Sequence, residues 1–143
     1  MRISEILRSK PRHDVVTIAP DETVRALLGL LAEHNVGAVV VSSDGEAVDG
    51  IVSERDVVRR LHENESSLDG AVSAIMTADV EVASLDDPVD DLRVVMTERR
   101  IRHVPVVTDG RLSGIISIGD VVKSSLDQLQ FERDQLDSYV HQT

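Results

Sequence analysis

The sequence predicts an α/β protein made of two copies of one β-α-β-β-α unit, packed about a pseudo-twofold axis and followed by a C-terminal helix. One observation is an internal duplication: when residues 15–58 are placed over 80–122, 15 of the 43 aligned pairs are identical. Another is the alternation of short apolar runs with segments of helical period. The third is a motif that occurs twice, at Gly50–Asp56 and Gly114–Asp120. Such a repeat indicates duplicated structural units.

The first copy is predicted to begin with a short helix and then to alternate strands and helices. Apolar residues at 3, 6 and 7 indicate a helix that ends before Pro11. Residues 15–18 form a predicted strand, and apolar residues at 24, 27, 28 and 31 give the next helix an apolar face. The run 36–41 and the pair 51–52 are predicted strands on either side of an Asp44-Gly45 turn.

The second copy repeats this order. Residues 72, 75 and 76 resemble 3, 6 and 7, residues 80–82, 104–107 and 115–116 are predicted strands, and Asp87-Pro88 opens a helix. Because three short strands cannot cover their own apolar sheet, the two copies must pack together. The predicted division is repeat 1 with the N-terminal helix at 1–61, a polar linker at 62–70, repeat 2 at 71–124 and a helical tail at 125–143.

Composition argues against several partners and chemistries. The net charge of −11 disfavours nucleic acid and anionic membranes. The absence of cysteine removes disulfides and thiol chemistry, and the five histidines show no metal-ligand spacing. No apolar run reaches the ~18 residues of a membrane span, and Met1–Glu5 does not resemble a signal peptide. We therefore expect a cytoplasmic protein without a metal site or a catalytic constellation.

Each repeated motif places Ser-x-x-Asp where a strand runs into a helix N-terminus. Backbone N–H groups are unpaired there and attract anions, phosphate in particular. The serine and the aspartate could hold a sugar phosphate between them. The same spacing is close to a capping box, in which the two side chains cap the helix reciprocally. The two roles are compatible, because a capping serine still presents its hydroxyl to a ligand.

The segment Arg99–His103 is the densest positive run of an acidic chain. At a helix C-terminus such a run complements the helix dipole, and this interpretation weighs about as much as a phosphate-binding role. Arg99 and Arg100 fit the structural role better. Arg102 and His103, at the start of a strand, fit the phosphate role better.

The tail carries a heptad-like seam at positions 122, 126, 129, 133, 136 and 140, interrupted by Arg133. Fewer than three heptads do not hold a coiled coil alone. The seam is therefore expected either to fold against its own module or to pair with another subunit.

In this order of motifs the chain resembles a tandem pair of cystathionine-β-synthase (CBS) domains, known as a Bateman module. The two motifs carry the resemblance over roughly residues 1–124, with support from Ile75–Thr77 and Ile101–Val106. Such modules are not enzymes. They bind adenine nucleotides or related adenosyl ligands between their repeats, so the resemblance implies AMP, ADP, ATP, NAD or S-adenosylmethionine as regulatory ligand. It places the motif aspartate on the ribose hydroxyls and the serine near the phosphate.

Carried onto this sequence, the resemblance implies two unequal clefts. The Asp120 cleft would use Ser117, Asp120, Arg102, His103, Pro11, Asp14, Val15, Val16, Val36 and Ala38. The Asp56 cleft would use Ser53, Arg55, Asp56, Met76, Thr77, Asp79, Val80 and Ile101. Gly37-Ala38 stand where the other copy has Arg102-His103, so the Asp56 cleft lacks those cations, which Arg55 replaces only in part.

The expected function is that of a stand-alone regulatory module, in which an adenosyl ligand shifts the packing of the repeats or of two modules in a homodimer. The regulated effector would be another, unknown chain. The main rival is a constitutive dimerisation scaffold without a physiological ligand. An enzyme is the weaker rival.

Overall fold

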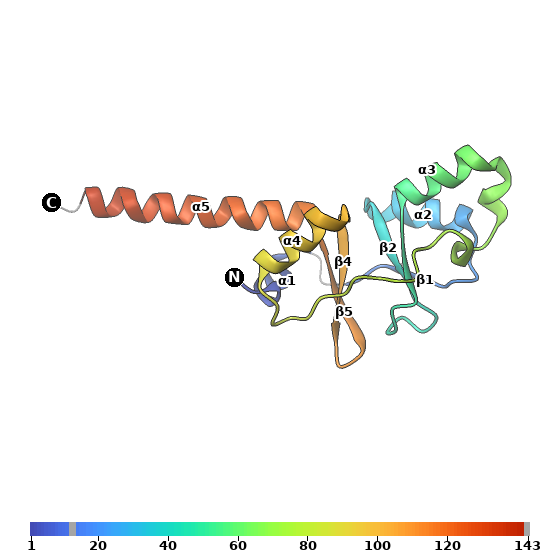
Figure 1. Cartoon of the computed structure of the whole chain (residues 1–143), viewed down its shortest axis with the longest axis horizontal. Helices are drawn as coiled ribbons and strands as arrows, with labels where there is room; N and C mark the ends of the chain where they lie inside the picture. Colours follow the sequence, from blue (N-terminus) through green and yellow to red (C-terminus); the bar gives the residue numbers. More distant parts are fainter. Residues whose placement is uncertain (12–13, 142–143) are drawn as a thin grey trace.

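A computed structural model describes residues 1–11 and 14–141 of the chain (Figure 1). Its elements in chain order are α1 (Ile3–Ser9), β1 (Thr17–Ile18), α2 (Val24–His34), β2 (Ala38–Val41), β3 (Gly50–Ser53), α3 (Glu54–Glu63), the 3-10 turns η1 (Glu65–Asp69) and η2 (Val72–Ala74), α4 (Val89–Arg99), β4 (His103–Thr108), β5 (Arg111–Ser117) and α5 (Ile118–Val140). The mixed α/β class, the two related units and the C-terminal helix are as the sequence predicts. The expected polar linker contains the end of α3 and η1.

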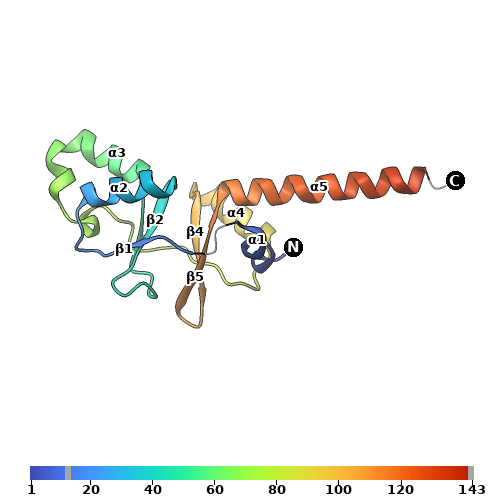
Figure 2. The same cartoon turned by 180° about the vertical axis from the view of Figure 1, so that it is seen from behind.

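The first unit is a three-stranded sheet under two helices. β1 pairs parallel with β2, and β2 pairs antiparallel with β3, so the sheet order is β1-β2-β3. Both views show α2 and α3 lying together beside this sheet (Figures 1 and 2). All four residues of β2 are buried, as a central strand requires. Leu27 on α2 and Val52 on β3 are fully buried in the resulting core.

The second unit is built on the antiparallel hairpin of β4 and β5. Its turn is formed by Asp109 and Gly110, both with positive φ, as expected for an Asp-Gly hairpin turn. The predicted strand at 80–82 is wrong: only Ala83 reaches the sheet, through one parallel bridge to Val106. The amide of Val107 donates to the Ala83 carbonyl (2.9 Å). The next donor on that side of β4 would be residue 105, a proline without an N–H, so the ladder stops.

The two units exchange their leading segments. α1 is first in the chain, but its Ile3 and Ile6 are buried in the core of the second unit, with α4, β4 and β5. The corresponding segment of the second copy, predicted to resemble α1, forms only the turn η2 and buries Val72 and Ile75 in the core of the first unit. Each core is therefore completed by residues of the other repeat, which ties the two halves together.

The motif glycines mark where the exchanged segments cross. A Cβ at Gly114 would lie 2.8 Å from the side chain of Leu7, on α1. A Cβ at Gly50 would lie 2.6 Å from the sulfur of Met76 and 2.9 Å from the Thr77 carbonyl oxygen. At both positions a side chain would meet a closely approaching segment, and neither glycine has a positive φ.

The C-terminal helix α5 spans 23 residues and continues well past the rest of the second unit (Figures 1 and 2). Val121 is buried, whereas Leu126, Leu129 and Leu136 are more than 60% exposed. Of the two expected arrangements, folding of the seam against its own module is therefore wrong. In the part of the chain that the structure describes, no helix combines the length and hydrophobicity that crossing a membrane requires.

Candidate functional site

Both Ser-x-x-Asp motifs form capping boxes at helix N-termini. At α5 the Ser117 amide donates to Asp120 Oδ2 (2.9 Å), and the Asp120 amide donates to Ser117 Oγ (3.1 Å). At α3 the Ser53 amide donates to Asp56 Oδ2 (2.8 Å), with the reverse bond at 3.3 Å. In both boxes every hydrogen bond from a described residue goes to Oδ2. Within residues 1–11 and 14–141 no group donates to Oδ1 of either carboxylate, so capping by itself does not exclude binding.

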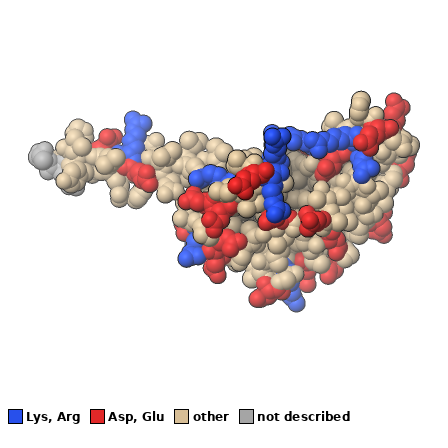
Figure 3. Space-filling view, in the orientation of Figure 1, with Lys and Arg blue, Asp and Glu red and all other residues tan. Residues whose placement is uncertain are grey.

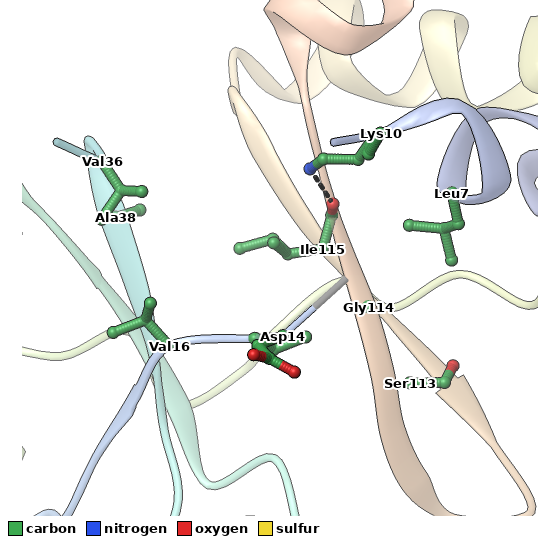
Figure 4. Close-up of a pocket in the computed structure, with 10 residues that line it drawn as sticks. Leu7, Lys10, Asp14, Val16, Val36, Ala38, Ser113, Gly114 and Ile115 are labelled. Carbon is green, nitrogen blue, oxygen red and sulfur yellow. Dashed lines mark hydrogen bonds between the residues drawn. The ribbon is translucent and has the colours of Figure 1, made fainter. Parts of the chain in front are cut away.

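Lys10 distinguishes the Asp120 motif from the Asp56 motif. Its Nζ lies 2.9 Å from Asp120 Oδ2 and 2.9 Å from the Ile115 carbonyl oxygen, the latter bond being drawn in Figure 4. Burial of Asp120 opposes its ionisation, but the Ser117 amide and Lys10 outweigh that effect and lower the pKa of Asp120 below 3.8. Asp120 is therefore a carboxylate at neutral pH. Among the described residues, Asp56 has no ion pair.

A cavity of about 160 Å³ lies between the two units beside this ion pair (Figure 4). Five residues predicted for the Asp120 cleft line it: Asp14, Val15, Val16, Val36 and Ala38. Five residues that the sequence analysis does not assign to the cleft line it too: Leu7, Lys10, Ser113, Gly114 and Ile115. Apolar walls from both units with few polar groups are typical of a small-molecule site.

A second hollow, of about 260 Å³, lies between α1 and the start of α5. Pro11 and Asp120, both predicted for the cleft, line this hollow together with Glu5, Lys123 and Asp127. The first cavity alone is smaller than the roughly 300–1,000 Å³ of ordinary ligand pockets. Lys10 is the residue that the linings of the two hollows share.

His103 and Arg102 lie where β4 meets the first unit. A Cβ at Gly37 would lie 3.6 Å from both the His103 ring and Glu54 Oε1, so the imidazole lies beside the N-terminus of α3. Burial lowers the pKa of His103 below 6.5, although Asp120 and Glu54 favour its protonation. Burial of the imidazole therefore disfavours the cationic form of His103 that the sequence suggests. Arg102 is exposed, and its carbonyl accepts from the Ile118 amide (2.8 Å).

The residues predicted for the Asp56 cleft are brought together only in part. Thr77 forms an antiparallel bridge with Ile51, and Met76 lies against Gly50, so this segment borders β3 just before Ser53. Ile101 packs instead against the core of the second unit. Arg55 is exposed, as is Asp79, while Val80 is half-buried. Among the described residues, no hydrogen bond or ion pair joins the side chains of these last three residues to Asp56.

Basic side chains gather near the junction of the two units on an otherwise acidic face (Figure 3). They extend over α3, which carries Arg55, Arg59 and Arg60. Arg99 pairs with Glu81 (2.7 Å), and Arg100 caps α4 in the left-handed conformation. Both therefore have the structural roles that the sequence favours for them. In the described ranges no group of three His, Asp or Glu side chains could hold a metal ion.

The sequence contained one signal for Lys10. In the alignment of the two copies, residue 7 matches residue 76 and residue 14 matches residue 79. Six residues separate the first pair of positions and two separate the second, so the first copy contains four extra residues, Lys10–His13. An insertion in one copy alone marks a difference between the clefts. The hydrogen bond from Lys10 to Asp120, 110 residues away, could not be predicted in this way, because it depends on the packing of α1 on the second unit.

Comparison with known proteins places this geometry in a family. The CBS domain family model matches residues 3–63 and again 72–127. A CBS-domain containing protein from Agrobacterium tumefaciens has a crystal structure that is similar with a TM-score of 0.83 and 42% identity, covering 87% of this chain and 99% of that one.

Two similar solved structures contain adenosyl compounds. A CBS domain protein from Pyrobaculum aerophilum complexed with AMP matches with a TM-score of 0.74 and 31% identity, over 84% of this chain and 89% of that one. The CBS domain pair of protein MJ0100, in complex with 5′-methylthioadenosine and S-adenosyl-L-methionine, matches with a TM-score of 0.78 and 26% identity, over 90% and 98%. The two family matches, the exchanged units and the shared cleft lead to one conclusion: this chain belongs to the CBS domain family and contains a CBS pair.

Proposed function

We propose that this chain is a regulatory CBS pair, without catalytic activity, that binds an adenosyl ligand in the Asp120 cleft. The observation that carries the proposal is the arrangement of the Asp120 carboxylate. Oδ2 holds the helix cap and Lys10, while Oδ1 receives no hydrogen bond from a described residue. A ribose hydroxyl can donate to Oδ1 without breaking the cap. AMP and S-adenosylmethionine complexes of similar pairs support this class of ligand.

The apolar walls of the cavity suit the adenine ring. Val16, Val36 and Ala38 come from the first unit, and Gly114 and Ile115 come from the second. A base between these walls would contact both units, so its binding energy would depend on their relative position. A ligand changes an equilibrium only by binding one arrangement better than another. This dependence is the physical basis for regulation that we propose, with an effector protein as recipient.

We further propose that Lys10 makes the Asp120 cleft selective for anionic adenosyl ligands. A phosphate attached to a ribose held by Asp120 lies within a few ångströms of the Lys10 ammonium, and their attraction is stronger in a partly buried cleft than in water. S-adenosylmethionine carries a sulfonium cation, which Lys10 would repel. Among the candidates AMP, ADP, ATP, NAD and S-adenosylmethionine, we therefore expect the phosphorylated ligands to bind more tightly.

The Asp56 cleft would bind the same ligands more weakly. Its aspartate has the same cap and the same available oxygen, but no described cation is paired with it. Both aspartates would then bind the ribose in the same way, and the two clefts would differ because only the Asp120 cleft contains Lys10.

A thermal-shift screen of the five candidate ligands, with adenosine as uncharged reference, tests the proposal. A ligand at one hundred times its Kd stabilises the native state by about 2.7 kcal/mol. For a chain of this size that raises Tm by several degrees. If no adenosyl compound at millimolar concentration moves Tm, a constitutive scaffold is the better account of the chain.

A further inference from the structure

The helix α5 carries an apolar stripe that no other part of the described chain covers. Its aliphatic side chains are 51–66% exposed: Val122, Leu126, Leu129, Leu136 and Val140. The hydrogen bond from Arg93 to Ser125 is the last along α5 that reaches another element. Beyond Ser125 the helix extends away from both units (Figures 1 and 2). A helical segment of about 15 residues is only marginally stable in water by itself, so packing of its apolar stripe would stabilise this end of α5.

We propose that the partner is α5 of a second copy of this chain, and that the two helices pair antiparallel about a twofold axis near residue 131. The stripe, including Arg133, steps by four and three residues from position 122 to 140. This is the spacing of a two-stranded coiled-coil seam. Fewer than three heptads do not hold an isolated coiled coil, but α5 is already anchored on its own module through the buried Val121. The charges beside the seam are complementary to those of a second copy, and they are complementary only when the two helices run in opposite directions.

A parallel pair would bring like charges together. Arg133 would face Arg133 of the second copy in the seam. Glu132, five residues before Asp137, would face that aspartate across the edge of the interface, twice by symmetry. Like charges at these positions act against pairing.

An antiparallel pair removes these conflicts. Val122 then meets Val140, Leu126 meets Leu136, and Leu129 packs on the aliphatic part of Arg133. Lys123 lies opposite Asp137 at both ends, giving two attractive pairs. Near the axis two Glu132 side chains approach each other, but both Arg133 guanidinium groups lie beside them. The stripe is therefore complementary to itself in this direction, independently of any ligand.

Because the chain has no cysteine, introduced thiols report the direction without background. In the antiparallel pair, the double variant Lys123→Cys/Asp137→Cys forms disulfide-linked dimers on mild oxidation, whereas neither single variant does. Leu136→Cys is the reporter for a parallel pair. Its sulfurs would meet in a parallel seam, but the antiparallel pair separates the two positions by about 15 Å along the axis, beyond disulfide reach. Efficient cross-linking of Leu136→Cys, or none of the double variant, overturns the proposal.

A charge variant tests the same direction without cross-linking. In the antiparallel pair, Asp137→Lys places an ammonium group opposite the ammonium group of Lys123, so the dimer dissociation constant should rise several-fold in analytical ultracentrifugation. In a parallel pair the same change would relieve the repulsion from Glu132 and lower that constant. The exchanged variant Lys123→Glu/Asp137→Lys should restore wild-type pairing. Circular dichroism of each variant confirms that α5 is retained, and a monomeric wild-type chain at tens of micromolar would end the proposal.

Discussion

The Lys10 ammonium and the Asp120 carboxylate form an ion pair with Nζ and Oδ2 2.9 Å apart, and their side chains are only 22% and 21% exposed. The same oxygen closes the capping box of α5. One carboxylate oxygen thus performs two structural tasks, and we propose that the other oxygen accepts a hydrogen bond from the ligand. The corresponding Asp56 performs the capping task with no cation beside it in the described chain.

Replacing Lys10 by methionine should lower affinity for AMP selectively. The change removes a charge-assisted interaction worth ~1.5–3 kcal/mol, so AMP should bind about ten- to a hundredfold more weakly while adenosine changes little. The measurement is calorimetric titration of both ligands. Arg8→Met, which removes an exposed charge two residues away, is the matched control. Equal losses for AMP and adenosine would mean that Lys10 only shapes the cleft.

The stability of the fold should depend on the ionisation of Asp120 at low pH. Because the folded-state pKa of Asp120 lies below 3.8, its carboxylate stabilises the native state above that pH. The contribution is lost as pH falls through the lowered folded pKa. The difference in unfolding free energy between wild type and Asp120→Asn, from urea titrations, should be constant near neutral pH and shrink below about pH 3.8. A difference that does not vary with pH contradicts this assignment.

The two motif glycines should respond differently to alanine. At Gly50 the new Cβ meets the Thr77 backbone oxygen at 2.9 Å, and backbone cannot move cheaply. At Gly114 it meets the end of the Leu7 side chain, which can rotate. Gly50→Ala should therefore cost on the order of 1–3 kcal/mol, as overpacked sites do, and Gly114→Ala less. Urea unfolding compares the two, and a larger cost at Gly114 would contradict the crossing described here.

Removing α5 beyond Ser125 should abolish the dimer and leave the cavity between the two units intact, since its lining ends at Ile115. The truncated chain keeps Val121, the buried residue of α5, together with the Asp120 cap. It should sediment as a monomer and still bind AMP with an affinity near that of the full chain. A truncated chain that remains dimeric would show that the faces of the module, rather than α5, hold the two copies together.

Much of the fold could be predicted because the sequence contains the same pattern of elements in two copies. Two Ser-x-x-Asp sequences at matching places gave two capping boxes, and Asp109-Gly110 gave the hairpin turn. The predicted strand at 80–82 is absent because an apolar run alone does not form a strand. A strand there would need a hydrogen bond from the backbone N–H of residue 105 in β4, and Pro105 has none. The missing hydrogen bond matters only because this segment lies beside β4, and that pairing is decided by the tertiary structure.

The family resemblance predicts five residues that line the cavity between the units, but it does not predict the Lys10–Asp120 ion pair. Lys10 reaches Asp120 because α1 packs on the second unit rather than on its own. The exchange of α1 and η2 leaves no mark in the local sequence, since both segments show the same apolar spacing wherever they pack. The sequence suggests a cation at His103, but the burial that lowers its pKa depends on the fold and cannot be predicted from the residue alone.

The most direct test is calorimetric titration of AMP into wild type, Asp120→Ala and Asp56→Ala. Either substitution should cost on the order of 0.5–2 kcal/mol of stability, because either removes a cap. If Asp120 also binds ribose, its substitution should weaken AMP about ten- to a hundredfold, by loss of hydrogen bonds worth ~1.5–3 kcal/mol. Asp56→Ala should have the smaller effect on affinity. Unchanged AMP affinity in both folded variants would contradict the account and leave Ser-x-x-Asp as a helix cap alone.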